Sequence, residues 1–504
     1  MNNFATTFLN VCAPFRLTKR SRLTTFNRNY QYGGIAMLVF LMIFGVGQTV
    51  AQHKSKPNII LCMADDQGWG DMGYNGHPVL KTPNFDSMAR SGLRFDHFYA
   101  AAPVCSPTRG SVLTGRHPNR FGVFSWGGLL RPQEITVAEA LKTAGYVTGH
   151  FGKWHLGPVR SGSPINPGNS GFDSWFSSPN FYNNNPILSR EGIAVQTQGE
   201  GSMVTADAAI EFIRAQTGNN QPFLAVVWFG SPHNPYAAIE QDLQLYAGQE
   251  EKLRNYYGEI TAMDRAFGKL RQELKTLKID KNTILLFCSD NGGVKGFSAT
   301  GGRGNKGQIY EGGLRVPAML EWPDQIPKPR VTNIPFNTSD IYPTLLEITG
   351  VKMKDQPPLD GISFVPLLKG TMKSRTQPMG FWQYPGGGIN EGSSAVLMAA
   401  LLKEQQAGIT TIDSAGLHLD AGVITRKYAE SSLPGHAAWL DWPYKLHRIN
   451  SKNEVKFELY NLEVDPEEKD DLSARHSKIT KSMKSLMETW QKSVIFSLNG
   501  GDYR

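Results

Sequence analysis

The stretch Asn58-Ile-Ile-Leu-Cys-Met-Ala64 is a continuous apolar run that stops at two acids, Asp65 and Asp66. An uninterrupted apolar run of this length is typical of a strand that is buried on both faces of a sheet. Similar runs recur along the chain, with helical patterns between them. The runs are residues 146–148, 223–229 and 283–288, and the helical patterns are residues 136–144, 205–215 and 251–277. This alternation predicts an α/β sandwich with a mainly parallel central sheet.

Oxygen-bearing side chains follow two of these runs directly. Asp65 and Asp66 follow the first run, and Asp290 and Asn291 follow the run at 283–288. In a parallel sheet the ligand site lies beyond the carboxyl ends of the strands. Carboxylate and amide oxygens suit Ca²⁺ and Mg²⁺, whereas zinc sites recruit histidine or cysteine. Each pair alone also fits an ordinary turn after a strand, but together they predict a divalent-cation site.

Basic side chains follow the other two runs. Lys153 and His155 come after residues 146–148, and His233 comes after Ser231 beyond residues 223–229. Considered singly, each fits a solvated lysine or a buried structural histidine. Because all of them are delivered to the same sheet edge, they predict one polar site with positive charge.

Length and composition exclude several classes of protein. The chain has 504 residues, enough for one large domain and a smaller one. Hydrophobic residues make up 40% and charged residues 19%, which excludes wholesale disorder. The net charge is +8, but residues 1–51 hold five basic residues and no acid, so 47 basic and 44 acidic residues remain in the body. This near-neutral body does not indicate nucleic-acid binding.

The N-terminal segment has the order of an export signal. A basic stretch ends at Arg28, an apolar run covers residues 35–46, and Ala51 closes a small-residue site. This order predicts a signal peptide over residues 1–51, and the alternative is an uncleaved N-terminal anchor. Both predict an exported protein, periplasmic or secreted.

Four cysteines are too few for a dense disulfide framework. Cys12 lies in the expected leader, and a pairing of Cys62 with Cys288 is open. Cys105 begins the stretch Cys-Ser-Pro-Thr-Arg-Gly-Ser-Val-Leu-Thr-Gly-Arg at residues 105–116. Its thiol fits a thiolate nucleophile assisted by Arg109, or a buried structural residue.

The pattern Cys105-x-Pro107-x-Arg109, followed by Leu113-Thr114-Gly115, resembles the signature of type I sulfatases, of the arylsulfatase and N-acetylgalactosamine-6-sulfatase kind. The resemblance runs in family order from residue 57 to about residue 472. It implies oxidation of Cys105 to formylglycine by a maturation enzyme. Its matching elements are Asp65-Asp66, Gly152-Lys-Trp-His-Leu-Gly157, His233, Ser289-Asp-Asn-Gly-Gly293, Lys306 with Tyr310-Glu-Gly-Gly313, and Glu458-Leu-Tyr-Asn-Leu462.

The resemblance also implies a role for each site residue. Ca²⁺, with Mg²⁺ as the less favoured ion, would be held by Asp65, Asp66, Cys105, Asp290 and Asn291. Lys153, His233 and Lys306 would contact the sulfate, and Arg109 would hold the formylglycine oxygen. His155 would remove a proton from the hydrate so that sulfate leaves. His233 is the first choice for the general acid and Asp290 the second.

The implied fold is the alkaline phosphatase-like sandwich, with a catalytic α/β domain over residues 56–371. Residues 372–504 are expected to form a smaller α+β domain. Residues 442–448 and 456–460 are predicted to be paired strands of that domain. Residues 477–492 carry apolar side chains at helical spacing, which predicts an amphipathic helix packed on its core.

Residues 386–438 fit no pattern fully. They begin with three glycines, include a helix-like stretch over residues 394–406, and lead to His436. This segment is interpreted as a surface elaboration or as a flap that reads the substrate. Aromatic and amide side chains near the expected site mouth fit either a sugar-binding rim or a packed loop. They are Trp126, Phe172, Trp175, Phe181, Tyr182 and residues 183–185.

The resemblance makes a sulfate ester on a sulfated carbohydrate the expected substrate. A phosphonate or phosphodiester hydrolase of the same superfamily is the enzymatic alternative. A secreted sugar-binding protein with an inactive site is the other alternative, and it would be favoured by loss of Cys105, Arg109 or Lys153, all of which are present. The specific sugar, the mode of action on a polymer and the oligomeric state are not indicated.

Overall fold

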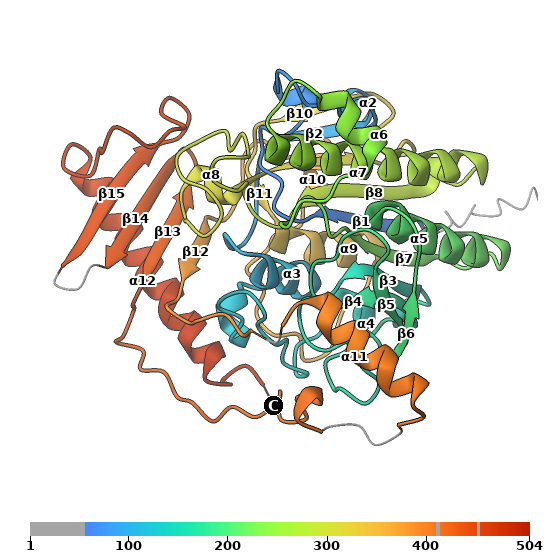
Figure 1. Ribbon diagram of the computed structural model, residues 1–504. Coiled ribbons are helices and arrows are strands. Elements are labelled where there is room, and N and C mark those ends of the chain that lie inside the picture. The colour runs from blue at the N-terminus through green and yellow to red at the C-terminus, as the bar shows by residue number, and fades with distance from the viewer. Residues whose placement is uncertain (1–55, 391, 410–413, 451–453, 504) are drawn as a thin grey trace, which may run out of the picture. The chain divides into compact units, whose positions relative to one another are not determined.

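A large, mostly parallel sheet occupies the centre of the described chain (Figure 1). The computed structural model describes residues 56–390, 392–409, 414–450 and 454–503, and the leader expected at residues 1–51 lies outside them. The strand order is β10-β2-β9-β8-β1-β7-β3-β4-β5-β6, with β11 beside β2. The five strands from β8 to β4 are mutually parallel. The predicted fold class is therefore confirmed.

The strands of this sheet arise from the whole first two thirds of the chain. They are β1 (Asn58–Ala64), β2 (Leu93–Tyr99), β3 (Val147–Lys153), β4 (Ser174–Ser178), β5 (Ile187–Arg190), β6 (Ile193–Gln196), β7 (Phe223–Trp228), β8 (Thr283–Ser289), β9 (Arg315–Glu321), β10 (Arg330–Thr332) and β11 (Phe336–Asn337). The helices between and after them are α2 (Pro83–Ser91), α3 (Cys105–Thr114), α4 (Val137–Lys142), α5 (Gly201–Gly218), α6 (Glu240–Leu243), α7 (Glu251–Thr276), α8 (Glu311–Leu314), α9 (Ile341–Thr349) and α10 (Val365–Leu368).

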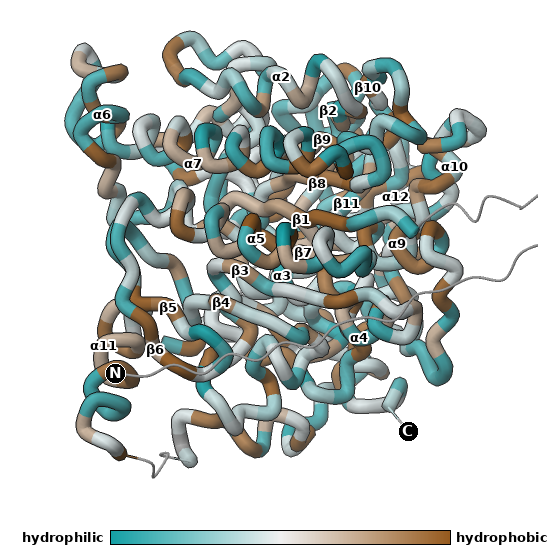
Figure 2. Tube along the Cα trace, turned by 90° about the vertical axis from the view of Figure 1, so that its right-hand side faces the viewer, coloured by the Kyte–Doolittle hydropathy of each residue, from teal (hydrophilic) through white to brown (hydrophobic). Residues whose placement is uncertain are grey.

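Helices cover both faces of the sheet. Ile60, Cys62 and Ala64 of β1 pack in one apolar cluster with α2, α5 and α7. The alternate residues Ile59 and Leu61 pack in a second cluster with α3, α4 and α9. Figure 2 shows the hydrophobic stretches concentrated in central strands such as β1 and β8. Both faces are buried because the strands are apolar without interruption.

The same alternation decides the open question of the cysteine pair. Cys62 belongs to one apolar cluster and Cys288 to the other. Both thiols are buried, and within the described part of the chain neither forms a disulfide. A pairing of these two cysteines is therefore wrong, because their side chains point to opposite faces of the sheet.

A second sheet of four antiparallel strands lies near the C-terminus, in the order β12-β13-β14-β15. Its strands are β12 (Met379–Gln383), β13 (His436–Asp441), β14 (Tyr444–Asn450) and β15 (Val455–Asn461), and α12 (Ser477–Leu498) packs on it. The strands expected near residues 442–448 and 456–460 correspond to β14 and β15. The predicted amphipathic helix is α12, in which Met483 and Met487 are buried whereas Leu486 is 48% exposed.

The helix-like stretch within residues 386–438 is α11 (Ser394–Gln406), as its sequence pattern indicates. Its Met398 and Leu401 join the apolar cluster of the large sheet. Among the helices that the structure describes, none is long and apolar enough to cross a bilayer.

Candidate active site

Two neighbouring strand ends place four oxygen-bearing side chains side by side. Ala64 at the end of β1 lies opposite Ser289 at the end of β8, so Asp65-Asp66 and Asp290-Asn291 leave the sheet together. The amide N of Asp66 donates to Oδ1 of Asp290 at 3.1 Å, and Nδ2 of Asn291 donates to Oδ1 of Asp66 at 2.9 Å. All four residues are buried. The register of two parallel strands therefore creates the acidic cluster.

Three buried or half-buried cations neutralise this cluster. Nζ of Lys153, the last residue of β3, lies 2.6 Å from Oδ2 of Asp65. Nη2 of Arg109 on α3 lies 2.7 Å from Oδ2 of Asp290 and 3.7 Å from Oδ1 of Asp65. Nζ of Lys306 lies 2.6 Å from both carboxylate oxygens of Asp66. Basic side chains from three separate segments thus converge on the acids. The strand ends predict this position for Lys153, whereas the family resemblance implies it for Arg109 and Lys306.

Cys105 is the first residue of α3, and it faces the same cluster. It is 2% exposed, and its Sγ lies within 4.8 Å of a carboxylate oxygen of Asp65 and of one of Asp290. Burial raises the pKa of the Cys105 thiol, although Lys153 and Lys306 act in the opposite direction. The thiolate interpretation is therefore disfavoured, because an unmodified Cys105 would hold its proton at neutral pH.

His155 follows β3 with both ring nitrogens buried. Neither nitrogen makes a hydrogen bond to a described residue. Burial holds the pKa of His155 well below its usual range, and the charges of Lys153 and Arg109 act in the same direction. The imidazole is therefore neutral and can accept a proton from a bound group.

His233 follows β7 and contacts the acidic cluster from the other side. Its Nδ1 lies 2.6 Å from the carbonyl oxygen of Asn234, which can only accept, so Nδ1 carries the proton. Its Nε2 lies 3.4 Å from Nζ of Lys306 and 3.6 Å from Oδ2 of Asp66. Burial lowers the pKa of His233 to about 4, although Asp66 opposes the shift. Phe181 stacks on the ring at 4.2 Å between centroids.

The oxygen cluster has the chemistry of a divalent-cation site. Oδ1 of Asp65 and Oδ1 of Asn291 are buried and make no hydrogen bond to any described residue. Burial and the neighbouring carboxylate of Asp65 raise the pKa of Asp290 to about 6. Burial alone would also raise the pKa of Asp66, but Lys306, His233 and Lys153 outweigh it and hold this pKa below its usual range. Buried oxygens that accept no hydrogen bond, together with crowded carboxylates, fit a hard cation.

The structure sorts the aromatic residues expected at the mouth of the site. Phe172, Trp175 and Tyr182 are buried in the apolar clusters, so for them the packed-loop interpretation holds. Trp126 is 42% exposed, and Phe181 contacts His233. One interpretation of the sequence makes His436 part of a flap that reads the substrate, but it is the first residue of β13 in the second sheet. Its Nε2 lies 2.9 Å from Nδ1 of His447.

Trp228 is a site neighbour that sequence reasoning missed. Its ring lies 5.1 Å from the guanidinium carbon of Arg109, which places an aromatic face beside the buried cation. In the sequence Trp228 is only the last residue of an apolar run. No local pattern distinguishes it from the other strand residues.

Comparisons with known proteins identify the family of the chain. Residues 57–351 match the sulfatase family. The chain is 34% identical over 387 residues to N-acetylgalactosamine-6-sulfatase of Mus musculus, which covers 68% of this chain and 72% of that protein. It is 33% identical over 333 residues to the ulvan-active sulfatase of Formosa agariphila, and the match covers 61% of this chain and 65% of that protein.

Solved structures share the fold. The crystal structure of Ps i-CgsB matches with a TM-score of 0.72 at 25% identity, and the match covers 88% of this chain and 98% of that one. The resemblance stated from the motifs is thereby confirmed, together with the alkaline phosphatase-like arrangement of the sheet and helices. The chain therefore belongs to the sulfatase family, whose members are sulfuric ester hydrolases.

Proposed function

We propose that this enzyme hydrolyses sulfate monoesters on sulfated carbohydrates, with Cys105 matured to formylglycine as the nucleophile. The observation that carries the proposal is the convergence of Cys105, three acids and three cations in one buried cluster. The names of the two relatives, an N-acetylgalactosamine-6-sulfatase and an ulvan-active sulfatase, support a sulfated sugar as the substrate.

The bound cation in this proposal is Ca²⁺, with Mg²⁺ less favoured. Its ligands would be Asp65, Asp66, Asp290, Asn291 and the matured side chain at position 105. Such a cation supplies positive charge next to the sulfate oxygens and the nucleophile. The unpartnered oxygens of Asp65 and Asn291 support this assignment.

The sulfate itself is held by donors of the chain. Lys153, Lys306 and His233 converge from three segments, and in the described structure the two lysines pair with Asp65 and Asp66. A sulfate ester carries negative charge on its free oxygens, so it offers these ammonium groups a second partner. Arg109 remains paired with Asp290 and holds the formylglycine oxygen in place.

The reaction divides into two steps. A hydroxyl of the formylglycine hydrate would lose its proton to water and attack sulfur, the bond between sulfur and the sugar oxygen would break, and the departing alcohol would take a proton from His233. The anionic substrate raises the pKa of this histidine from its low value in the free site, which makes it a competent acid. Asp290 is the second candidate for this role.

Release of sulfate uses the second hydroxyl of the hydrate. His155 removes its proton, the carbon–oxygen bond to sulfate breaks, and the aldehyde re-forms and is hydrated again by water. The neutral imidazole of His155, buried and without a described partner, supports its role as the base. A serine would have no second hydroxyl to trigger this release.

The remaining assignments concern the chain as a whole. We assign residues 1–51 to an export leader or anchor, residues 56–371 to the catalytic domain and residues 372–504 to a C-terminal subdomain. The enzyme would then act in the periplasm or outside the cell, after a formylglycine-generating enzyme has matured Cys105.

Peptide mass spectrometry on protein from its own host tests the proposal. Conversion of the thiol at position 105 to an aldehyde lowers the peptide mass by about 18 Da. We expect this shift together with hydrolysis of 4-nitrophenyl sulfate. Active protein with an unmodified Cys105 would overturn the formylglycine mechanism. A matured protein that cleaves only phosphonate or phosphodiester probes would support the other hydrolase class, and a matured protein without activity would support a binding role.

A further inference from the structure

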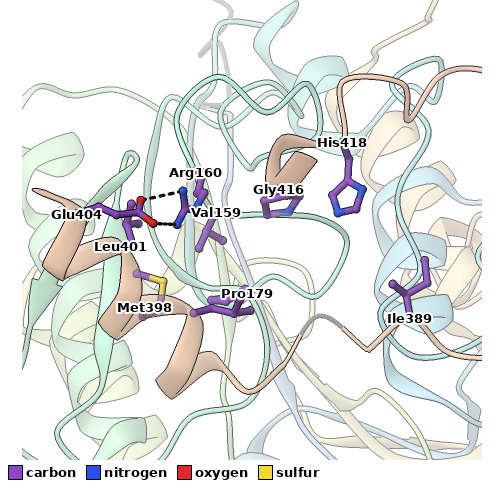
Figure 3. A pocket seen from close by; sticks show the side chains of 11 residues that line it. Val159, Arg160, Pro179, Ile389, Met398, Leu401, Glu404, Gly416 and His418 are labelled. Carbon is purple, nitrogen blue, oxygen red and sulfur yellow. Dashed lines mark hydrogen bonds and ion pairs between the residues drawn. The ribbon is translucent and has the colours of Figure 1, made fainter. Parts of the chain in front are cut away.

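A cavity of about 410 Å³ lies between α11 and the loop that follows His155 (Figure 3). In this view α11 contributes Met398, Leu401 and Glu404 to one wall, and Ile389 and His418 lie across from them. Leu397 of the same helix also lines the cavity. Pro158, Val159, Arg160 and Pro179 form a further part of the lining. Most of this cavity is built by the segment whose role the sequence left open.

The cavity lies next to the segments that carry Lys153 and His155. Pro179 accepts a hydrogen bond at its carbonyl oxygen from the amide of His155 at 3.2 Å. Oγ of Ser394, at the start of α11, lies 2.9 Å from Oγ of Ser178, and Ser178 is the β4 partner of Lys153. One backbone contact therefore joins the cavity to the proposed base, and one side-chain contact joins it to the strand of the sulfate-binding lysine.

A second connection reaches the nucleophile. The amide of Ile389 donates to the carbonyl oxygen of Trp126 at 3.0 Å. The amide of the next residue, Gly127, donates to Oγ of Ser106 at 2.9 Å, and Ser106 is adjacent to Cys105. The cavity is thus bordered on two sides by segments that hold the proposed catalytic side chains.

The chemistry of the walls fits a sugar ring. Among the lining residues, the exposed Ile389 and the half-buried Leu397 offer an apolar surface for the carbon–hydrogen face of a ring. At one end Arg160 and Glu404 form an ion pair, with nitrogen–oxygen distances of 3.0 and 3.1 Å. Their partly exposed guanidinium and carboxylate groups are suited to bind hydroxyl groups. The volume lies in the range of about 300–1,000 Å³ that is usual for small-ligand pockets.

We propose that this cavity is a subsite for the sugar unit next to the sulfated one, so that the enzyme prefers sulfated oligosaccharides to sulfated monosaccharides. The proposal rests on the proposed function and assigns one part of the substrate to α11 and the other described residues that line the cavity. The two hydrogen-bonded connections carry the proposal, because they place the cavity beside the segments of His155 and Cys105. A sugar ring in the cavity could then belong to the same oligosaccharide as the ester being cleaved.

The test is a pair of tryptophan variants on adjacent positions of α11. Leu397→Trp fills the cavity, whereas Val396→Trp adds the same side chain at a position that is 67% exposed and does not line it. Each matured protein is assayed with 4-nitrophenyl sulfate, with N-acetylgalactosamine 6-sulfate and other sulfated monosaccharides, and with sulfated oligosaccharides that include ulvan fragments. In Leu397→Trp we expect the ratio of kcat/KM for oligosaccharide to that for monosaccharide to fall about tenfold or more, through KM. In Val396→Trp the ratio stays at the wild-type value.

Arg160→Met is the second variant, which keeps the experiment decisive if Leu397→Trp does not fold. It removes the polar end of the cavity and should lower the same ratio. Equal losses on both substrate sizes, or no loss in either variant, would overturn the subsite. A wild-type enzyme that hydrolyses 4-nitrophenyl sulfate but shows no preference for any oligosaccharide would also overturn it. A matured wild type without sulfatase activity would instead defeat the proposed function.

Discussion

Nη2 of Arg109 lies 2.7 Å from Oδ2 of Asp290, and neither side chain is exposed to solvent. This ion pair joins the helix that begins with Cys105 to the end of β8. Removing one partner of such a buried pair leaves the other charge uncompensated. We expect Arg109→Met to lower the free energy of unfolding by about 3–5 kcal/mol, measured by urea unfolding in EDTA. Arg109→Lys keeps the charge and should lose less, and equal stability of Arg109→Met and the wild type would contradict the assignment.

Calcium should stabilise the enzyme through the acidic cluster. A ligand that binds only the folded state adds about 2.7 kcal/mol at a concentration one hundred times its Kd. We expect the Tm to rise on adding Ca²⁺ and to fall with EDTA. Asp65→Asn should lose this response, whereas Asp207→Asn, which changes a half-exposed acid on α5, should retain it. A response that is the same in both variants would place the ion elsewhere.

Replacement of Cys105 should remove activity without unfolding the protein. We expect Cys105→Ala to reduce hydrolysis of 4-nitrophenyl sulfate by about 10³-fold or more, because no aldehyde can form. Cys62→Ala is the matched control, since Cys62 is an equally buried thiol outside the site. Retention of activity by Cys105→Ala, with a native unfolding curve, would show that another group is the nucleophile.

His155 and His233 should affect different steps. Without the base His155, the sulfated enzyme cannot release sulfate, so His155→Ala should release about one equivalent of alcohol per active site and then stop. Rapid-quench kinetics measure this burst, and intact mass detects the trapped adduct. His233→Ala should show no burst and should lose more activity on alkyl sulfates than on aryl sulfates, because a poor leaving group depends more on the acid. Absence of a burst in His155→Ala would argue against its role as the base, and a burst in His233→Ala would argue against its role as the acid.

Acid should weaken the attachment of α12. Asp360 pairs with Arg120 at 2.7 Å and accepts a hydrogen bond from Nε1 of Trp490 on α12 at 2.9 Å. Burial alone would raise the pKa of Asp360, but Arg120 and His117 hold it below its usual range. The pair therefore adds stability above the unfolded-state pKa, and this stability is lost as the pH falls.

We expect Asp360→Asn to be less stable than the wild type by about 3 kcal/mol at pH 7. The difference should narrow towards pH 3, as followed by urea unfolding at several pH values. Asp470→Asn, at an exposed ion pair with Arg475, should change stability by less than about 1 kcal/mol at any pH. A difference between wild type and Asp360→Asn that is independent of pH would contradict the explanation.

The local patterns of the sequence predict the strands that carry the site but not their neighbours. β1 and β8 are evident as apolar runs, and their polar ends meet as expected. β2 is not evident, because Arg94, Asp96 and His97 interrupt its apolar pattern. Its antiparallel pairing with β9 joins Leu93 to Leu320, more than two hundred residues away. Such a pairing depends on tertiary packing, so it cannot be recognised from the sequence of either segment alone.

The same limit applies to single side chains. Trp126 and Trp175 both follow a serine in the sequence, yet Trp126 is 42% exposed, whereas Trp175 lies in β4 and is 4% exposed. Which of them contacts solvent depends on the segments packed above it. For example, the amide of Ile389, from a distant part of the chain, donates a hydrogen bond to the carbonyl oxygen of Trp126. Motif order identifies catalytic positions, whereas substrate-facing positions emerge only once distant loops are placed.

Every residue of α3 is buried, from Cys105 to Thr114. Under the proposed maturation of Cys105, the oxidising enzyme would have to reach this side chain before the helix is buried. The fraction of active molecules would then be set by a race between oxidation and folding. Slower translation or a more abundant maturation enzyme would raise that fraction, whereas later incubation of folded protein would not.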